Sequence, residues 1–234
     1  MAIVGSRKPT AYGRRTAIAL ASRLGSLGVP IISGLAFGID ATVHEAAIDA
    51  GGCTVAVLPG GLDPANLSPR SHLRLAERVL GRGALLSEYA DGTPVRKEHY
   101  AARNRLISGL ARCVVVIEGA LPSGSLLTAR HAADQGRDTW ALPGPIDSPV
   151  SAGTNHLIEQ GAFPLTNIDT FMETLGLTGL AASDPLVSRF TRPAHVDELL
   201  ADGQWSAAEL EAAIGKLELR GVIRHLGGRY YVRV

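Results

Sequence analysis

Residues 2–8 read Ala-Ile-Val-Gly-Ser-Arg-Lys, and this stretch indicates both the fold and the place of a ligand. Three apolar residues form a buried strand that runs into a glycine turn, and residues 12–27 have the spacing of a helix. Glycine at such a turn lets the backbone approach a ligand, and the helix N-terminus offers N–H groups and partial positive charge to a phosphate. The start of the chain therefore predicts a phosphate site.

Alternation of strand and helix continues to residue 165. Short β-rich runs joined by helices imply right-handed crossovers and a mostly parallel sheet covered on both faces. We therefore predict an α/β fold, with a Rossmann-like doubly wound domain over residues 1–175. The predicted strands are residues 2–4, 30–32, 54–58, 84–87, 113–117 and 138–141. The helical segments include residues 39–50, 73–80 and 126–135.

A second, smaller unit follows residues 176–183, which have the composition of a linker. Within residues 184–234, Ser206 and Glu209 form a capping box, and the glycine pair at 227–228 marks a hairpin turn. Three short helices followed by a hairpin predict a small C-terminal winged-helix domain. The predicted helices are residues 185–190, 196–201 and 206–219.

Composition excludes several classes of protein. A chain of 234 residues with 46% hydrophobic content can form a sizeable core, so a disordered or fibrous protein is excluded. No apolar run approaches the roughly 20 residues of a membrane-spanning helix, and the N-terminus lacks a secretory signal. Cys53 and Cys113 each open an apolar run, which indicates reduced, buried thiols. We expect a cytoplasmic protein without membrane insertion.

Charge is unevenly distributed, although the net charge is only +1. No acid precedes Asp40, so the N-terminal lobe is locally basic. Its helical cations are consistent with a solvated face, whereas Arg7 and Lys8 follow a strand end, where open parallel sheets bind ligands. The cations of this lobe are Arg7, Lys8, Arg14, Arg15 and Arg23.

Residues 96–105 read Arg-Lys-Glu-His-Tyr-Ala-Ala-Arg-Asn-Arg, which places four cations and one aromatic ring in ten residues. A ring beside Lys97 and Arg103 suits stacking on an unpaired base, worth about 1–3 kcal/mol per base. The alternatives are that Tyr100 belongs to the core of the following helix and that one arginine clamps a strand end. We favour Lys97 and Tyr100 over either arginine as ligand contacts.

Further loops follow the carboxyl ends of predicted strands and therefore share one edge of the sheet. Ser33 and Gly34 open a loop whose hydroxyl and N–H groups suit a second phosphate. For the serines of residues 123–125, helix capping competes with ligand contact. Asp40 and His44 share a helical face, for which a structural role is favoured over acid/base catalysis.

Signals of several other activities are missing from the sequence. It contains no Gly-x-x-x-x-Gly-Lys-Ser/Thr loop, no Gly-x-Gly-x-x-Gly after the first strand, and no His/Cys cluster with zinc spacing. We therefore predict neither a metal site nor a cofactor.

A series of motifs recurs in order along residues 2–165. They are residues 3–7 (IVGSR), 33–40 (SGLAFGID) with His44, 56–61 (AVLPGG), 87–89 (SEY), 103–107 (RNRLI), Glu118 with 123–129 (SGSLLTA), and 143–144 (PG). In this order they resemble the DNA processing protein A (DprA/Smf) family, and the C-terminal unit resembles that family's winged-helix module.

The resemblance implies a cytoplasmic homodimer that binds incoming single-stranded DNA and loads the RecA recombinase onto it during natural transformation. It also implies that Arg7 and Lys97 contact phosphates and that Tyr100 stacks on a base. With the strand-end loops included, the predicted DNA contacts are Gly5, Ser6, Arg7, Ser33, Gly34, Lys97, Tyr100, Arg103, Asn104, Ser123, Gly124 and Ser125. No catalytic residue is predicted.

Two features depart from the family pattern. Members usually carry an N-terminal extension, whereas this sequence begins inside the first strand, so we expect a trimmed or short form. The last predicted helix has three glutamates against Lys216, and residues 184–234 carry seven acids against seven Lys and Arg. Such a helix is poorly suited to the major groove of duplex DNA.

Two other functions stay open. Some Rossmann-like relatives with Pro-Gly-Gly loops cleave the glycosidic bond of nucleoside monophosphates, and Glu118 and Glu88 are the candidate carboxylates for that chemistry. A duplex-binding regulator acting through the winged unit is the other possibility. We favour a sequence-independent single-strand binder that is not an enzyme, because stacking and phosphate contacts read no base edges.

Overall fold

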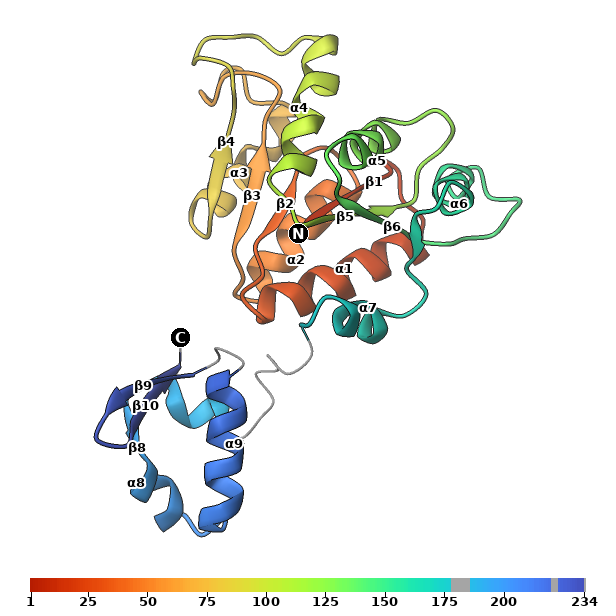
Figure 1. The fold of residues 1–234 in the computed structure, drawn as a ribbon. Coiled ribbons are helices and arrows are strands. Elements are labelled where there is room, and N and C mark those ends of the chain that lie inside the picture. The colour runs from red at the N-terminus through yellow and green to blue at the C-terminus, as the bar shows by residue number, and fades with distance from the viewer. Residues whose placement is uncertain (178–185, 220–222, 234) are drawn as a thin grey trace. The chain divides into compact units, whose positions relative to one another are not determined.

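The computed structural model describes residues 1–177, 186–219 and 223–233, and the chain divides into two compact units (Figure 1). The first unit is Met1–Phe171 and the second is Met172–Val234. Most of the expected linker at 176–183 lies outside the described residues. Each unit has its own hydrophobic core.

The first unit is built on a seven-stranded sheet in which every pairing is parallel. The strand order β4-β3-β2-β1-β5-β6-β7 reverses between β1 and β5, and such a switch point opens a ligand crevice at the carboxyl ends of the strands. The predicted Rossmann-like, doubly wound sheet is confirmed. The strands are β1 (Ala2–Gly5), β2 (Ile31–Ser33), β3 (Thr54–Val57), β4 (Ala84–Leu86), β5 (Cys113–Ile117), β6 (Asp138–Ala141) and β7 (Phe163–Pro164).

Helices cover both faces of this sheet (Figure 1). The helices are α1 (Ala11–Ser26), α2 (Ile39–Asp49), α3 (Leu73–Leu80), α4 (Lys97–Gly109), α5 (Gly124–Asp134), α6 (Ala152–Glu159) and α7 (Ile168–Thr174). Helices α1 and α2 pack against each other, as do α4 and α5, and the core between α4, α5 and the sheet includes Val4, Ile107 and Ala129. The three helical segments predicted between residues 39 and 135 are therefore confirmed, and α6 and α7 add to them.

The centre of the sheet explains two features of the sequence. Ile3, Val115 and Ile117 are fully buried, as the strands of a sheet covered on both faces must be. Gly5 is required by the close approach of neighbouring strands: a Cβ atom there would lie 1.9 Å from the carbonyl oxygen of Ile117. The glycine of the first turn thus serves strand packing at the switch point.

The second unit is a winged-helix domain, as predicted. Its three-stranded antiparallel sheet has the order β8-β10-β9, and its core includes Phe190, Leu210 and Ile214. The capping box forms, because Ser206 N–H donates to Glu209 Oε2 at 3.0 Å and Glu209 N–H donates to Ser206 Oγ at 3.3 Å. Its elements are a 3₁₀ turn (Val187–Thr191), β8 (Ala194–His195), α8 (Val196–Ala201), α9 (Ala207–Leu219), β9 (Ile223–Gly227) and β10 (Tyr230–Arg233).

The 3₁₀ turn takes the place of the helix expected at 185–190, whose first residue lies outside the described part of the chain. The hairpin turn also shifts by one residue. Gly227 pairs with Tyr230, so the two-residue loop is Gly228 and Arg229, both with positive φ (58° and 65°).

Neither cysteine forms a disulfide: Cys53 is half-buried and Cys113 is buried. No helix in the described residues has the length and apolar character needed to cross a membrane. In the same part of the chain, no group of three or more His, Cys, Asp or Glu side chains is placed to hold a metal ion.

Candidate nucleic-acid interface

The loops after β1, β2 and β5 meet where the strand order reverses. Ser6 is half-buried, whereas Arg7 and Lys8 are exposed, and Lys8 N–H donates to Ser6 Oγ at 3.1 Å. Elsewhere in the basic lobe, Arg23 pairs with Asp169 at 3.1 Å. Arg7 and Lys8 therefore present positive charge at the edge of the sheet where ligands bind.

Arg7 lies against the predicted stacking residue. Its guanidinium carbon is 5.4 Å from the centroid of the Tyr100 ring, a cation–π distance. Tyr100 is half-buried, and its hydroxyl forms a hydrogen bond with Ser68 Oγ at 3.1 Å. The structure thus brings together Arg7 and Tyr100, which are 93 positions apart in the sequence, and the ring is neither in the core nor free to swing.

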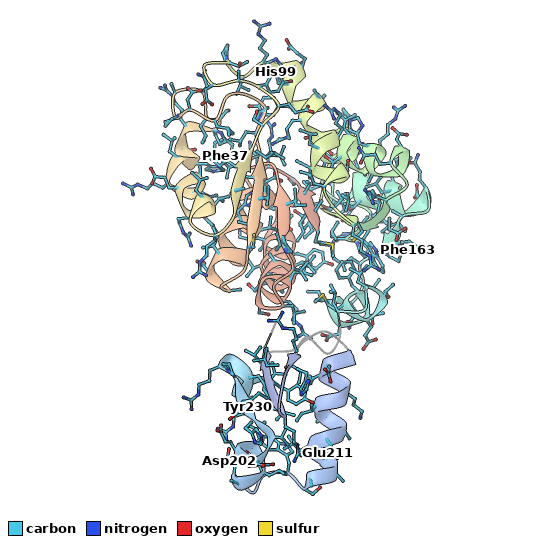
Figure 2. The ribbon with its side chains drawn as sticks, turned by 60° about the vertical axis from the view of Figure 1, so that its left-hand side comes forward. Phe37, His99, Phe163, Asp202, Glu211 and Tyr230 are labelled. Carbon is cyan, nitrogen blue, oxygen red and sulfur yellow. The ribbon has the colours of Figure 1, made fainter. Side chains whose placement is uncertain are left out.

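The first turn of α4 presents Lys97 on the same side as Tyr100, because residues three apart on a helix are neighbours. Lys97 is exposed. The start of the helix is held by His99, whose ring stacks on Tyr89 with centroids 4.2 Å apart and whose Nδ1 is 3.0 Å from the carbonyl oxygen of Pro59. Figure 2 shows His99 at this end of the sheet. Lys97 therefore extends from a fixed platform into solvent.

Arg103 points into the domain. It is 4% exposed, and its guanidinium donates to the carbonyl oxygens of Gly34, at 2.8 Å, and of Val57. Burial lowers the pKa of Arg103, and the nearby Asp40 charge opposes that shift. Arg103 thus ties the ends of β2 and β3 together, which is the clamping role considered from the sequence, and its charge is directed away from solvent.

Three more predicted contacts are buried around this arginine. The Ser33 hydroxyl donates to the carbonyl oxygen of Ile3 at 2.7 Å, and Asn104 Nδ2 donates to that of Gly124 at 3.1 Å. A Cβ atom on Gly34 would lie 2.7 Å from the Arg103 guanidinium, so packing requires this glycine. Ser33, Gly34 and Asn104 therefore support the loops from inside the domain, where the side chains of Ser33 and Asn104 form hydrogen bonds.

Asp40 and His44 are structural neighbours of the same cluster. The Asp40 carboxylate accepts N–H bonds from Gly34 at 3.1 Å and Ala36 at 3.4 Å, and burial raises its pKa. His44 Nδ1 is 2.7 Å from Thr54 Oγ1, and burial lowers the pKa of His44 to about 3. A neutral, buried imidazole matches the structural role that we favoured for the pair.

The start of α5 supplies the other side of the crevice. Ser123 and Ser125 bond to each other, with Oγ atoms 2.9 Å apart, and the Ser123 side chain makes no capping bond. Gly124 is exposed at the first position of the helix. The N–H groups of this turn and the helix dipole are therefore available to an anion.

The N-terminus of α1, where dinucleotide-binding folds place a phosphate, is filled by the protein itself. Glu118, with a left-handed φ of 55°, accepts Thr10 N–H at 2.8 Å and the Thr10 hydroxyl. Glu88, the other candidate carboxylate of an enzyme, pairs with Arg105 at 2.5 Å. Both carboxylates are thus committed within the protein.

Phe37 was not predicted from the sequence. It is 50% exposed in the loop between β2 and α2, and its ring lies edge-on to His72 with centroids 4.9 Å apart. Figure 2 shows it at the same end of the sheet as His99. An aromatic residue inside a glycine-containing strand-end loop is the signal that could have identified it.

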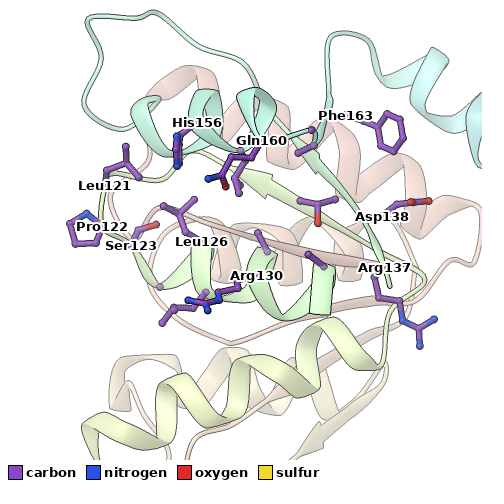
Figure 3. A pocket seen from close by; sticks show the side chains of 18 residues that line it. Leu121, Pro122, Ser123, Leu126, Arg130, Arg137, Asp138, His156, Gln160 and Phe163 are labelled. Atoms are coloured by element: carbon purple, nitrogen blue, oxygen red, sulfur yellow. The ribbon is translucent and has the colours of Figure 1, made fainter. Parts of the chain in front are cut away.

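A hollow of about 980 Å³ lies between α5 and α6 (Figure 3). Arg130 comes from α5 and His156 from α6, while Leu126 and Phe163 contribute apolar surface. Ser123 and Gly124 line one end of it. Its charges have both signs because Asp138 also lines it, so it differs in chemistry from the cationic edge around Arg7.

The fold and this edge define a class: Rossmann-like proteins with a cationic switch point beside an aromatic ring, followed by a winged-helix unit. The DNA recombination-mediator protein A family model matches residues 1–176, and a DprA winged helix domain matches residues 191–229. The chain belongs to the DNA recombination-mediator protein A family, the DprA/Smf proteins, and the resemblance seen in the sequence is confirmed.

Relatives and solved structures agree with this assignment. Protein Smf of Escherichia coli is 46% identical over 176 residues, which are 75% of this chain and 46% of that protein. DNA processing protein DprA of Bacillus subtilis is 40% identical over 183 residues, which are 78% of this chain and 61% of that protein. This chain therefore spans about half the length of the curated relatives that it matches.

Two solved structures share the first unit. DNA processing protein A of Helicobacter pylori, described for its single-stranded DNA binding mode, aligns with a TM-score of 0.69 and 34% identity over 74% of this chain and 78% of that chain. DprA of Streptococcus pneumoniae aligns with a TM-score of 0.67 and 38% identity, covering 74% of this chain and 60% of that chain.

Proposed function

We propose that this protein binds single-stranded DNA, without sequence preference, at the carboxyl edge of its Rossmann-like sheet. The observation that carries the proposal is the Arg7 guanidinium over the Tyr100 ring, 5.4 Å from its centroid. A cation and a ring at one point are the two components of single-strand recognition, phosphate attraction and base stacking. The H. pylori relative described for single-stranded DNA binding supports this choice of ligand.

The two components act together when a strand enters. The exposed cation–π contact is worth about 0.5–1 kcal/mol, whereas stacking of a base on the ring is worth about 1–3 kcal/mol. A base therefore takes the face of Tyr100, and Arg7 turns to the neighbouring phosphate. Lys8 and Lys97 add charge, and the N–H groups at Gly124 provide a further anion site.

Ser6 and Ser123, which bonds to the buried Ser125, complete the proposed rim, while the other buried residues hold it in place. Ser33, Gly34, Arg103 and Asn104 act by fixing the loops that present Arg7 and Gly124. Gly5 allows β1 and β5 to close up beneath the crevice. No proposed contact reads a base edge, so affinity is the same for every sequence apart from differences in stacking.

The biological role that we propose is the one implied by family membership: a cytoplasmic homodimer that loads RecA recombinase onto incoming DNA during natural transformation. We propose no catalytic turnover, because Glu118 and Glu88, the candidate carboxylates, are both engaged by neighbours, and the proposed binding requires no cofactor. Sedimentation of the purified chain tests the dimer, and RecA filament assembly on single-stranded DNA with and without the protein tests loading.

Binding itself is tested by titration of oligo-dT, a mixed-sequence oligomer of equal length and the corresponding duplex. Both single strands are expected to bind with the same affinity, and both more tightly than the duplex. Equal or tighter binding of the duplex would contradict the proposal and favour a duplex-binding regulator.

A further inference from the structure

The loop between β2 and α2 carries a second aromatic ring that the proposed site has not used. Phe37 is 50% exposed, although a phenylalanine gains about 1.5–3 kcal/mol from full burial. Its ring does not hang free, because it lies edge-on to His72 at 4.9 Å and an interplanar angle of 68°. An edge-to-face contact occupies at most one face of the ring, and the other face is left to solvent.

The backbone of this loop is fixed on the Arg7 turn. Ile39 N–H donates to the carbonyl oxygen of Ser6 at 3.1 Å. Gly38 has a φ of 78°, and a Cβ atom there would lie 2.3 Å from the Ser6 carbonyl oxygen and 2.6 Å from the Arg7 carbonyl carbon. Phe37, the preceding residue, is therefore held next to Arg7 by contacts that tolerate only glycine at the following position.

One short segment supports both rings. Ser68 bonds to the Tyr100 hydroxyl at 3.1 Å, and His72, four positions later, contacts the Phe37 ring. His72 is itself held, with Nδ1 2.9 Å from the carbonyl oxygen of Leu35. Residues 68–72 thus hold both the Tyr100 ring and the Phe37 ring. The Arg7 guanidinium contacts the Tyr100 ring, and the Arg7 backbone lies against the loop that carries Phe37.

The geometry points to Phe37, backed by His72, as a second base-stacking platform. The arrangement ring, cation, ring matches the order base, phosphate, base of a dinucleotide step in a single strand. The inference rests on the proposed function and extends it, because it sets the minimal ligand at two unpaired nucleotides, with Tyr100 and Phe37 taking one base each and Arg7 the phosphate between them.

The test compares oligo-dT with an abasic oligomer of the same length, which keeps the phosphates and lacks the bases. Phe37→Ala is expected to weaken binding of oligo-dT by about 5-fold to 150-fold, the equivalent of about 1–3 kcal/mol, and to leave binding of the abasic oligomer unchanged. Phe37→Leu, which stays apolar without a π-face, should behave like Phe37→Ala. Phe37→Trp should bind like the wild type, with its indole fluorescence quenched by oligo-dT.

His72 provides a second, positioning test. His72→Ala should weaken oligo-dT binding in the wild type and have no further effect in the Phe37→Ala background, because the two side chains act through one ring. Thermal unfolding of each variant checks that the fold is retained, which the exposure of Phe37 favours.

The outcomes separate this inference from the proposed function. If Phe37→Ala binds oligo-dT like the wild type while Arg7→Ala binds weakly, the second platform is wrong and the single-strand site stands. If Phe37→Ala weakens the abasic oligomer as much as oligo-dT, the ring acts by shaping the loop and the stacking role is overturned. If the wild type does not bind oligo-dT, the proposed function fails and the inference fails with it.

Discussion

The carboxyl edge of the first unit and the described part of the second unit differ in whether their exposed cations are paired with carboxylates. At the carboxyl edge of the first unit, Arg7, Lys8 and Lys97 are exposed, and no ion pair within residues 1–177 joins them to a carboxylate. In the described part of the second unit, Arg229 pairs with Asp197 at 3.3 Å and with Glu211 at 3.4 Å, and Arg189 pairs with Asp202.

This difference distinguishes the two surfaces more clearly than net charge does. A cation without a partner carries a field that a phosphate can use, whereas a paired one must first lose its carboxylate. Figure 2 shows Asp202 and Glu211 among the side chains of the winged unit. We therefore propose that the DNA site lies in the first unit, and the following predictions test that proposal.

The largest effect is expected from the buried arginine of the first unit. Arg103→Ala removes the donor to two buried carbonyl groups and leaves Asp40 without its compensating charge. The free energy of unfolding should fall by about 3–5 kcal/mol, as when one partner of a buried charge pair is removed. Urea unfolding monitored by circular dichroism measures it.

Arg105→Ala, two residues along the same helix, is the matched control. Its exposed pair with Glu88 should contribute only about 0–1 kcal/mol. If Arg103→Ala and Arg105→Ala lowered the free energy of unfolding equally, burial would not explain the structural role of Arg103. Arg103→Lys should be intermediate, because an ammonium keeps the charge and can donate to carbonyl oxygens but loses the bond from Nε to Asn104 Oδ1.

The next largest effect is expected from the Tyr100 ring in single-strand binding. Tyr100→Ala should weaken single-strand binding by about 1–3 kcal/mol, while Tyr100→Phe should cost little because the π-face remains. Loss of the hydroxyl bond to Ser68 makes Tyr100→Phe the control for positioning. If Tyr100→Ala bound normally and melted at a much lower temperature, the ring would be a core residue and the stacking role would be wrong.

The fold was predictable because short apolar runs alternate with segments of helical spacing over the first 141 residues, and every predicted strand there is present. The order of the strands in the sheet was not predictable, since it depends on which strands lie side by side in space. Gly5 is obligatory because a Cβ atom there would lie 1.9 Å from the carbonyl oxygen of Ile117, which is far away in the sequence. From the sequence alone, this glycine was therefore interpreted as a residue that lets the backbone approach a ligand.

The sequence placed Arg7, Lys97 and Tyr100 in the candidate site, and the structure brings all three to one edge; their contacts with DNA stay predictions. The site was less predictable at Arg103, because the acceptors that bury this side chain belong to β2 and β3, 69 and 46 positions away. A cation in a cationic run gives no local sign of burial. Phe37 was missed because an apolar residue is expected to be buried, although its place in a glycine-containing strand-end loop was a sign of its exposure.

A smaller effect is expected from single phosphate contacts. Arg7→Ala and Lys97→Ala should each remove about 1 kcal/mol of affinity, equally for every sequence, and reduce the salt slope by about 0.7 for each phosphate that is no longer neutralised. Arg23→Ala is the matched control, since Arg23 is exposed but already paired with Asp169. Salt slopes unchanged in Arg7→Ala and Lys97→Ala would remove both residues from the site.

The smallest effect is expected from deletion of residues 184–234. This segment has seven acids and seven Lys and Arg, so counterion release gains it little, and single-strand affinity should stay within about threefold, roughly 0.7 kcal/mol. A competing idea is that Arg224, Arg229 and Arg233 gather on the hairpin wing and grip a phosphate backbone.

Against that idea, the two guanidinium contacts of Arg229 go to Asp197 and Glu211, so Arg229 would have to break both pairs before it could bind DNA. The winged unit therefore fits a protein-contact role better than a DNA-contact role. Titration of the full-length and truncated chains against oligo-dT and a duplex decides between the two. If truncation lowers the affinity for oligo-dT tenfold or more, the contrast between the units is wrong. If it lowers only the affinity for the duplex, the protein is better explained as a duplex-binding regulator.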